Sequence, residues 1–341
     1  YAASPASVHA AQVVQALRAG TLVIVEKPAV TEIDDWDELV ALSKQHGVVL
    51  LEAIRTRFDP GLAAVRDVLP QLGQLRRVML RYEKRSSRYD LVLAGETPNI
   101  FDPRLGGGAL RDLGIYCIHA LIALVGAPES VVAAAVRLPT GADGLGTIVG
   151  SYPGFIADLH FSKITTPDQP SVIEGENGIL MIDEIDGPRT LTLVLNGAEP
   201  RTIVVEGPTN VLESEVHRFA ALVAGQDDAD ADNAGREHRS RAATQQLEVV
   251  GRQLAQHHAQ RTLEHRVELT HHVLAGIGRA QPSDAAVVRV VAAADQPLLD
   301  ESVDQAAGGR RADPQQAAEL LAGQPWLLDE VIEHPQLLDG Q

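Results

Sequence analysis

The sequence is poor in cysteine, in positive charge and in uninterrupted apolar stretches. Its single cysteine, Cys117, excludes a disulfide framework and a thiolate metal cluster, and it indicates a reducing compartment, for which we expect the cytoplasm. Lysine and arginine number 29 against 46 aspartates and glutamates, a formal net charge of −17. This balance argues against nucleic acid and anionic membranes as partners, because both attract cations. The most apolar segment, residues 108–126, carries Arg111 and Asp112, so we expect a core helix there and not a membrane span.

Strands and helices alternate at the start of the chain. Residues 21–25 and 48–51 form short continuous apolar runs, which are typical of strands buried on both faces of a parallel sheet. A helical pattern precedes the first run, with Ser7 as its expected N-cap, and a second pattern between the runs closes near Gly47. Together with a strand end at residues 1–3, this βαβ rhythm predicts a doubly wound α/β sheet.

The pattern then changes to alternating apolar and polar side chains, as in an antiparallel strand with one covered face. We expect strands at 75–82, 130–138, 145–152, 155–163, 171–174, 178–183, 190–195 and 201–205. Helices are expected from residue 60 to about 72, at 210–224 and at 236–257, with a polar loop at 85–105. Strands in such succession predict a second, α+β domain on a largely antiparallel sheet.

The end of the chain has a different texture, rich in alanine, glutamine, arginine and histidine. It shows amphipathic stretches at 260–275, 284–294 and 314–333. Its histidines lack an accompanying carboxylate or thiol spacing, and the acidic segment 227–233 fits a solvated link, so we expect no metal site. The expected domains are 1–60, the C-terminal half of a dinucleotide-binding domain, 61–257, a substrate and dimerisation domain, and 258–341, an unassigned helical tail.

A glycine run followed by a helix is the most informative stretch. Residues Gly106 to Gly108 let the backbone turn freely and approach a ligand closely. On the helix that follows, Asp112, Tyr116 and His119 fall at i, i+4 and i+7, and therefore on one face. Such side chains are costly to bury without a task or partners. The alternative is that Asp112 caps the first turn while the other two are half-buried amphipathic residues.

Three motifs occur together in this chain. The first strand ends in Glu26–Pro28, with sequence EKP, where α/β sheets bind ligands, although a solvated strand end would look the same. The others are Glu52–Phe58, with sequence EAIRTRF, and residues 106–116, with sequence GGGALRDLGIY. In this order they resemble the Gfo/Idh/MocA family of NAD(P)-dependent oxidoreductases, most of all its dimeric dihydrodiol dehydrogenase branch, over roughly residues 1–257.

The resemblance implies a Rossmann-type parallel sheet, followed by a C-terminal α/β domain whose largely antiparallel open sheet often forms a dimer contact. It implies NAD or NADP as cofactor, a homodimer or higher homo-oligomer, and hydride transfer at a CH–OH or C=O group of a sugar, polyol or dihydrodiol. The residues that it implies for catalysis are Lys27, Asp112, Tyr116 and, one turn further on, His119. Those that it implies for cofactor binding are Ser4, Pro5, His9, Glu26, Lys27, Pro28 and Arg55.

The chemistry is coherent with these roles. Hydride transfer to a carbonyl leaves negative charge on oxygen, which needs a proton donor within hydrogen-bond reach. By resemblance Tyr116 is this donor, Lys27 orients the substrate and the acid/base, and Asp112 orients the substrate or a hydroxyl. An ammonium next to a phenol favours its ionised form, so Lys27 must lie beside Tyr116 for the interpretation to hold.

One departure from the family concerns the cofactor. The fingerprint G-x-G-x-x-G should follow the first strand of a Rossmann domain, but the chain opens at Tyr1 beyond that point. We therefore expect this polypeptide to be an incomplete form that binds NAD(P) poorly, with the longer parent as the enzyme. Two other interpretations stay open: a non-catalytic dimerisation or regulatory module of the same fold, and a sugar-binding domain. The sequence decides neither NAD against NADP nor the substrate.

Overall fold

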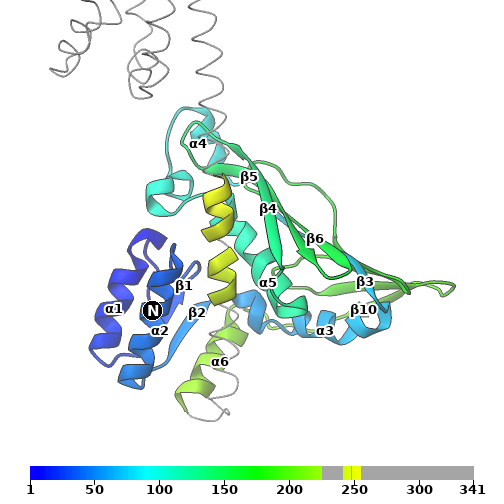
Figure 1. Ribbon diagram of the computed structural model, residues 1–341, viewed down its shortest axis with the longest axis horizontal. Coiled ribbons are helices and arrows are strands. Elements are labelled where there is room, and N and C mark those ends of the chain that lie inside the picture. Colours follow the sequence, from blue (N-terminus) through cyan, green and yellow to red (C-terminus); the bar gives the residue numbers. More distant parts are fainter. Residues whose placement is uncertain (225–240, 247, 255–341) are drawn as a thin grey trace, which may run out of the picture. The chain divides into compact units, whose positions relative to one another are not determined.

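A computed structural model describes residues 1–224, 241–246 and 248–254 (Figure 1). The chain divides into two units, Tyr1–Gln256 and His257–Gln341. The acidic segment 227–233 and the amphipathic stretches expected in the tail lie outside the described residues, as does part of the helix expected at 236–257.

A small parallel sheet opens the first unit. Its elements are α1 (His9–Arg18), β1 (Val23–Glu26), α2 (Ile33–His46) and β2 (Leu50–Ala53). The strands β1 and β2 are parallel, and Ala2 adds a parallel bridge to Val25, so the first residues run along β1. Leu17 of α1 and Leu39 of α2 are fully buried in the core that joins the helices to this sheet. The βαβ rhythm expected for this part of the chain is confirmed.

The helix ends differ in one respect from the expectation. Ser7 does not cap α1, because it lies within a 3-10 turn, Ala6–Val8, and Val8 takes the N-cap position without a side-chain hydrogen bond. The end of α2 is as expected: Gly47 adopts a left-handed conformation with φ of 62° and its amide closes the last turn. A glycine suits that position because it has no Cβ to clash.

A large sheet forms the second part of the unit (Figure 1). Its strands are β3 (Leu75–Glu83), β4 (Ser130–Arg137), β5 (Asp143–Tyr152), β6 (Phe155–Ser162), β7 (Ser171–Gly175), β8 (Gly178–Ile182), β9 (Thr190–Leu195) and β10 (Arg201–Val204). Their order is β10-β9-β8-β7-β3-β6-β5-β4. All neighbours are antiparallel except β3 and β6, which are parallel. The largely antiparallel sheet is confirmed.

Helices cover one face of this sheet. They are α3 (Pro60–Val68) and α5 (Ile115–Val125), the latter preceded by a π-helical turn, Leu110–Gly114. Ile118 of α5 packs with Leu62, Leu80 and Phe161 in the main hydrophobic core. The segment Pro103–Val125 is long and apolar enough to pass as a membrane span, but 61% of its apolar 18-residue stretch is buried inside the unit. In this fold it is the central core helix.

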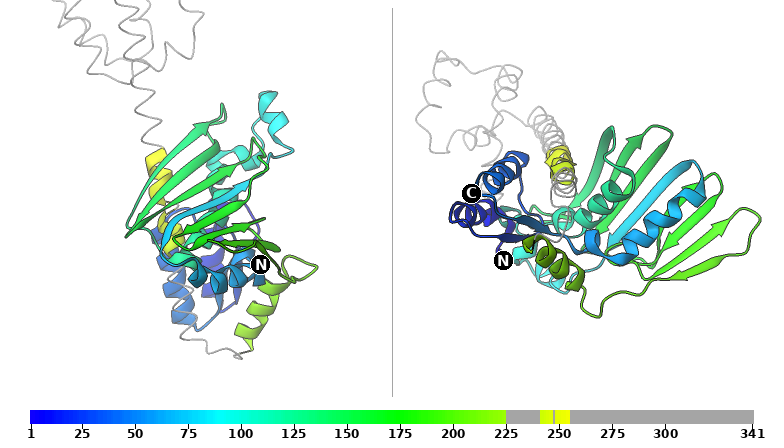
Figure 2. Two further views of the ribbon diagram at one scale, coloured as in Figure 1. Left: turned by 90° about the vertical axis from the view of Figure 1, so that its right-hand side faces the viewer. Right: turned by 90° about the horizontal axis from the view of Figure 1, so that it is seen from below.

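The remaining described helices are short or peripheral. They are α4 (Tyr89–Leu93), α6 (Glu213–Val223), 3-10 turns at Arg55–Phe58, Leu69–Leu72, Asn99–Phe101 and Pro103–Leu105, and helical residues at 241–246 and 248–254. The segment 85–105, expected as a polar loop, therefore contains helical turns. The other face of the large sheet is left open (Figure 2). The exposed side chains of Val132 and Val136 on β4 and of Ile156 on β6 alternate with buried ones and therefore belong to this face.

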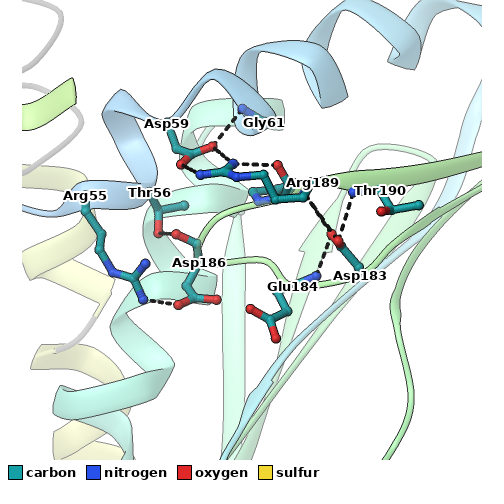
Figure 3. Close-up of polar contacts among 10 residues, drawn as sticks. Arg55, Thr56, Asp59, Gly61, Asp183, Glu184, Asp186, Arg189 and Thr190 are labelled. Atoms are coloured by element: carbon teal, nitrogen blue, oxygen red, sulfur yellow. Dashed lines mark hydrogen bonds and ion pairs between the residues drawn. The ribbon is translucent and has the colours of Figure 1, made fainter. Parts of the chain in front are cut away.

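The segment after β2 is docked onto the β8–β9 loop (Figure 3). Both carboxylate oxygens of Asp59 accept hydrogen bonds of 2.7 Å from the Arg189 guanidinium, and the Thr56 hydroxyl donates to the carbonyl of Asp186 at 3.0 Å. Asp59 also caps α3 by accepting from the amide of Gly61. These contacts join the small-sheet part of the chain to the large sheet.

We expect Gly61→Ala to destabilise the protein. A Cβ built at Gly61 would lie 2.1 Å from the carbonyl oxygen of Pro188, so backbone must shift, which costs about 1–3 kcal/mol. The matched control is Gly251→Ala: this helical glycine has no atom within 4 Å of its would-be Cβ, and alanine should stabilise the helix by about 0.5–1 kcal/mol. Denaturant unfolding measures both changes. Equal stability of the two variants would contradict the close contact at Gly61.

Candidate active site

Lys27 and the start of the central helix meet at the end of β1. Lys27 directly follows β1, and its ammonium donates to the Asp112 carbonyl at 2.7 Å and to the Asp112 carboxylate at 2.8 Å. The same nitrogen lies 5.0 Å from the centre of the Tyr116 ring. Residues 85 and more positions apart in the sequence thus converge, because the carboxyl end of the parallel strand points at the π-helical turn that carries Asp112.

A second lysine, not anticipated from the sequence, also reaches Asp112. Lys163 follows β6, is 2% exposed, and forms an ion pair with the other carboxylate oxygen of Asp112. Burial raises the pKa of Asp112, but the charges and hydrogen bonds of Lys27 and Lys163 outweigh it and bring this pKa to about 2. Asp112 is therefore an anion at neutral pH. In the sequence, Lys163 is a single lysine after a strand of alternating apolar and polar residues. A lysine at a solvent-exposed strand end would give the same pattern, so the sequence did not reveal its burial.

Two cations lie close to the Tyr116 ring. The Lys27 ammonium is 5.0 Å and the guanidinium carbon of Arg55 5.5 Å from its centre. Arg55 is held by an ion pair with Asp186, drawn in Figure 3. Tyr82 packs edge-on against Tyr116, with ring centres 5.2 Å apart and planes at 87°. Cations over an aromatic face are attracted by it, so this arrangement fixes the ring and gives it a positive surrounding.

His119 lies in the interior, against Glu52. Its Nε2 is 3.3 Å from a Glu52 carboxylate oxygen, and the other oxygen of Glu52 accepts from the amide of Ala29 at 3.1 Å. Burial lowers the pKa of His119, although the Glu52 charge opposes the change, so the imidazole is neutral at physiological pH. The Glu52 side chain therefore links His119 to the backbone that follows Lys27.

The remaining residues implied for the cofactor gather around β1. The ring nitrogens of His9 lie 2.9 Å from the carbonyl oxygen of Pro28 and 2.8 Å from that of Ser4. His9 therefore ties the turn at Ser4 and Pro5 to the end of β1. Glu26 carries its carboxylate at that same end, within 3.2 Å of the Lys27 amide.

Glu215 on α6 is a further acid that sequence analysis missed. It is 3% exposed, and its Oε2 atom has no hydrogen-bond partner. Burial, together with the charges of Glu26 and Glu52, raises its pKa from 4.5 to about 7, while Arg55 opposes the change. The sequence shows only a single glutamate in an amphipathic helix, which does not predict a buried carboxyl. The burial arises because α6 packs near the segment after β2.

The glycine run packs against the protein itself. A Cβ at Gly107 would lie 2.8 Å from the carbonyl oxygen of Asn99, and one at Gly108 would lie 2.2 Å from a carboxylate oxygen of Asp143. Asp143 in turn accepts from the amide of Leu110 at 2.6 Å. Gly108 therefore leaves room for Asp143, which holds the start of the helix, while the approach of a ligand to the glycine run stays a prediction.

In comparisons with known proteins, the part with the small parallel sheet and the part with the large sheet match two different family models. Residues 1–53 match a model described as "Oxidoreductase family, NAD-binding Rossmann fold", and residues 68–181 match the "GFO/IDH/MocA C-terminal domain". Scyllo-inositol 2-dehydrogenase (NADP(+)) IolU of Bacillus subtilis is 36% identical over 223 residues, which cover 65% of this chain and 68% of that protein. Trans-1,2-dihydrobenzene-1,2-diol dehydrogenase of Sus scrofa is 34% identical over 179 residues, 51% of each chain.

A solved structure shows the same fold. The 3-ketoreductase KijD10 of Actinomadura kijaniata, in complex with NADP, superposes with a TM-score of 0.62 at 21% identity, over 74% of this chain and 76% of that one.

The residues present fit one end of a dinucleotide. At the end of β1, the Glu26 carboxylate and the Lys27 ammonium offer an acceptor and donors suited to ribose hydroxyls and a carboxamide. The glycines of the small-sheet part that the structure describes, Gly20 and Gly47, follow α1 and α2, so neither opens a helix after a strand as a pyrophosphate cradle does.

We expect Glu215→Gln to change how stability depends on pH. The pKa of Glu215 is about 7 in the folded protein and 4.5 in the unfolded chain. Between these two pH values the carboxyl is protonated in the folded state but ionised in the unfolded state, so the free energy of unfolding falls as the pH rises from 4.5 to about 7. Above pH 7 the loss is about 3 kcal/mol, which the glutamine avoids. Unfolding free energies of both proteins between pH 4 and about 8 should therefore diverge. Glu213→Gln, exposed on the same helix, should follow the wild type, and parallel curves for Glu215→Gln would refute the effect.

Proposed function

Because this chain belongs to the Gfo/Idh/MocA family of oxidoreductases, we propose that it transfers a hydride between NAD(P) and a CH–OH or C=O group of a sugar, polyol or dihydrodiol. The observation that carries the proposal is the convergence of Lys27, Asp112 and Tyr116 at the end of β1. The substrate class is supported by relatives that are named as a scyllo-inositol dehydrogenase and as dihydrodiol dehydrogenases.

Each residue has a task in this proposal. NAD(P), when bound, supplies or accepts the hydride. The Tyr116 phenol donates a proton to the carbonyl oxygen during reduction and takes it back during oxidation. Lys27 stabilises the phenolate and the charge that develops on the substrate oxygen, and Asp112 keeps the Lys27 ammonium in place.

The residues around β1 have supporting tasks. Glu26 and Lys27 would hold the nicotinamide side of the cofactor, with Ser4, Pro5 and Pro28 forming the wall that His9 ties together. Arg55, which the resemblance implies for the cofactor, lies 5.5 Å from the centre of the Tyr116 ring, so it would bind the cofactor close to the phenol. His119 acts through Glu52 on the backbone after Pro28, as a support for the site.

Substitution of the phenol tests the proposal. We expect Tyr116→Phe to slow hydride transfer at least about 100-fold, since the proton donor is lost, while NADP(H) affinity stays unchanged. The matched control is Tyr82→Phe, which removes the neighbouring phenol and should lower the rate by less than about tenfold. Absorbance of NADPH reports the rate with inositol, sugar and dihydrodiol substrates.

The assay needs a high cofactor concentration. Poor binding of NAD(P) by this polypeptide stays a prediction, and titration of NADPH fluorescence measures the affinity directly. Full activity of Tyr116→Phe at saturating cofactor would favour the alternative of a sugar-binding or regulatory module. A cytoplasmic location also stays a prediction.

We further propose that the open face of the large sheet pairs two copies of the chain. Val132 on β4 is 63% exposed there, and Ile156 on β6 is exposed on the same face, an arrangement typical of an interaction surface. The wild type should sediment as a homodimer, and Val132→Arg as a monomer, because a charge at the contact is desolvated on pairing. The comparison is Val216→Arg, because Val216 is 55% exposed on α6, outside the sheet, and this variant should still form the dimer. A monomeric wild type would exclude the proposed contact.

A further inference from the structure

Lys163 gives the site a second positive charge from inside the protein. Resting on the proposed function, we propose that Lys163 is a positioning residue, which holds the Asp112 carboxylate from behind so that its other oxygen fixes the Lys27 ammonium beside Tyr116.

The carboxylate of Asp112 is divided between the two lysines. One oxygen accepts from Lys27 at 2.8 Å and the other pairs with Lys163. The side chain of Asp112 is 41% exposed, whereas that of Lys163 is 2% exposed. A substrate can therefore approach Asp112 but not Lys163, so any effect of Lys163 on the reaction is transmitted through Asp112.

The fold holds Lys163 tightly. Its amide donates to the carbonyl of Gly144, and its carbonyl accepts from the amide of Ser86, both at 2.8 Å. The Lys163 ammonium lies 5.0 Å from the centre of the Phe101 ring and 3.5 Å from the carbonyl oxygen of Ile100. Backbone bonds to two neighbouring segments and a packed side chain leave Lys163 little freedom, which suits a fixed anchor for Asp112.

The charges explain what this anchor contributes. Lys27 and Asp112 alone would form a neutral pair, whereas Lys163 makes the group +1 overall. A net positive charge next to the substrate favours the oxygen that becomes negative during hydride transfer. A carboxylate held on both oxygens also cannot rotate away from Lys27. A purely structural ion pair between β6 and the π-helical turn would contribute neither effect, which makes the two roles separable by experiment.

Kinetics of Lys163 variants are the first measurement. We expect Lys163→Met to lower kcat about 10- to 100-fold with a much smaller change in KM, and Lys163→Arg to recover part of the loss because the charge returns. Removing one partner of a buried ion pair is destabilising, although Lys27 still pairs with Asp112, so melting temperatures are measured first and kcat is compared at a temperature where all variants are folded. The control is Lys84→Met: this exposed lysine follows β3 as Lys163 follows the adjacent strand β6, and its loss should leave kcat unchanged.

Titration of Asp112 is the second measurement and does not require activity. The 13C resonance of its carboxyl, assigned with Asp112→Asn, should begin to titrate about one pH unit higher in Lys163→Met than in the wild type. Identical curves to the acid limit of the folded state overturn the proposal, as does an unchanged kcat in an active enzyme. If all proteins, wild type included, fail to transfer hydride while the titration shifts, the proposed function fails but the hold of Lys163 on Asp112 is supported.

Discussion

The ion pair between Lys27 and Asp112 is the interaction on which the site depends. Lys27 ends a strand of the small parallel sheet, and Asp112 begins the core helix that covers the large sheet. A lysine in this position loses much of its hydration, which is favourable only if its hydrogen bonds are replaced. The carboxylate and carbonyl of Asp112 provide them. The same bonds that join the two parts of the unit therefore place an ammonium beside the Tyr116 ring.

The other charged residues of this region follow the same rule. Arg55 is paired with Asp186, Arg189 with Asp59, and Lys163 with Asp112. Each of these partly or fully buried cations therefore forms an ion pair with a carboxylate. Glu215 is the exception, since its nearest charges include other carboxylates, and its raised pKa follows from that. Asp112 and Glu215 both have strongly shifted pKa values, and such values cluster at functional sites, which supports the proposed site.

Most of the fold could be predicted because periodicity is a local property. Alternating and continuous apolar runs predicted the parallel and antiparallel strands, and the strands of the large sheet lie close to the expected ranges. The errors arose where a local signal has more than one meaning. Ser7 resembles an N-cap but lies in a 3-10 turn, and Gly108 makes room for the Asp143 carboxylate, a contact that the glycine run did not suggest. The catalytic roles of Lys27, Asp112 and Tyr116 stay proposals.

Sequence by itself determined the order of elements, the family, and the face of the helix that carries Asp112, Tyr116 and His119, because helical spacing decides which side chains point the same way. Only the tertiary structure decided what this face meets: Lys27 at Asp112 and Tyr116, but Glu52 at His119. It alone revealed Lys163 and Glu215, since burial and the charge of distant neighbours arise from packing between elements and leave no periodic trace along the chain.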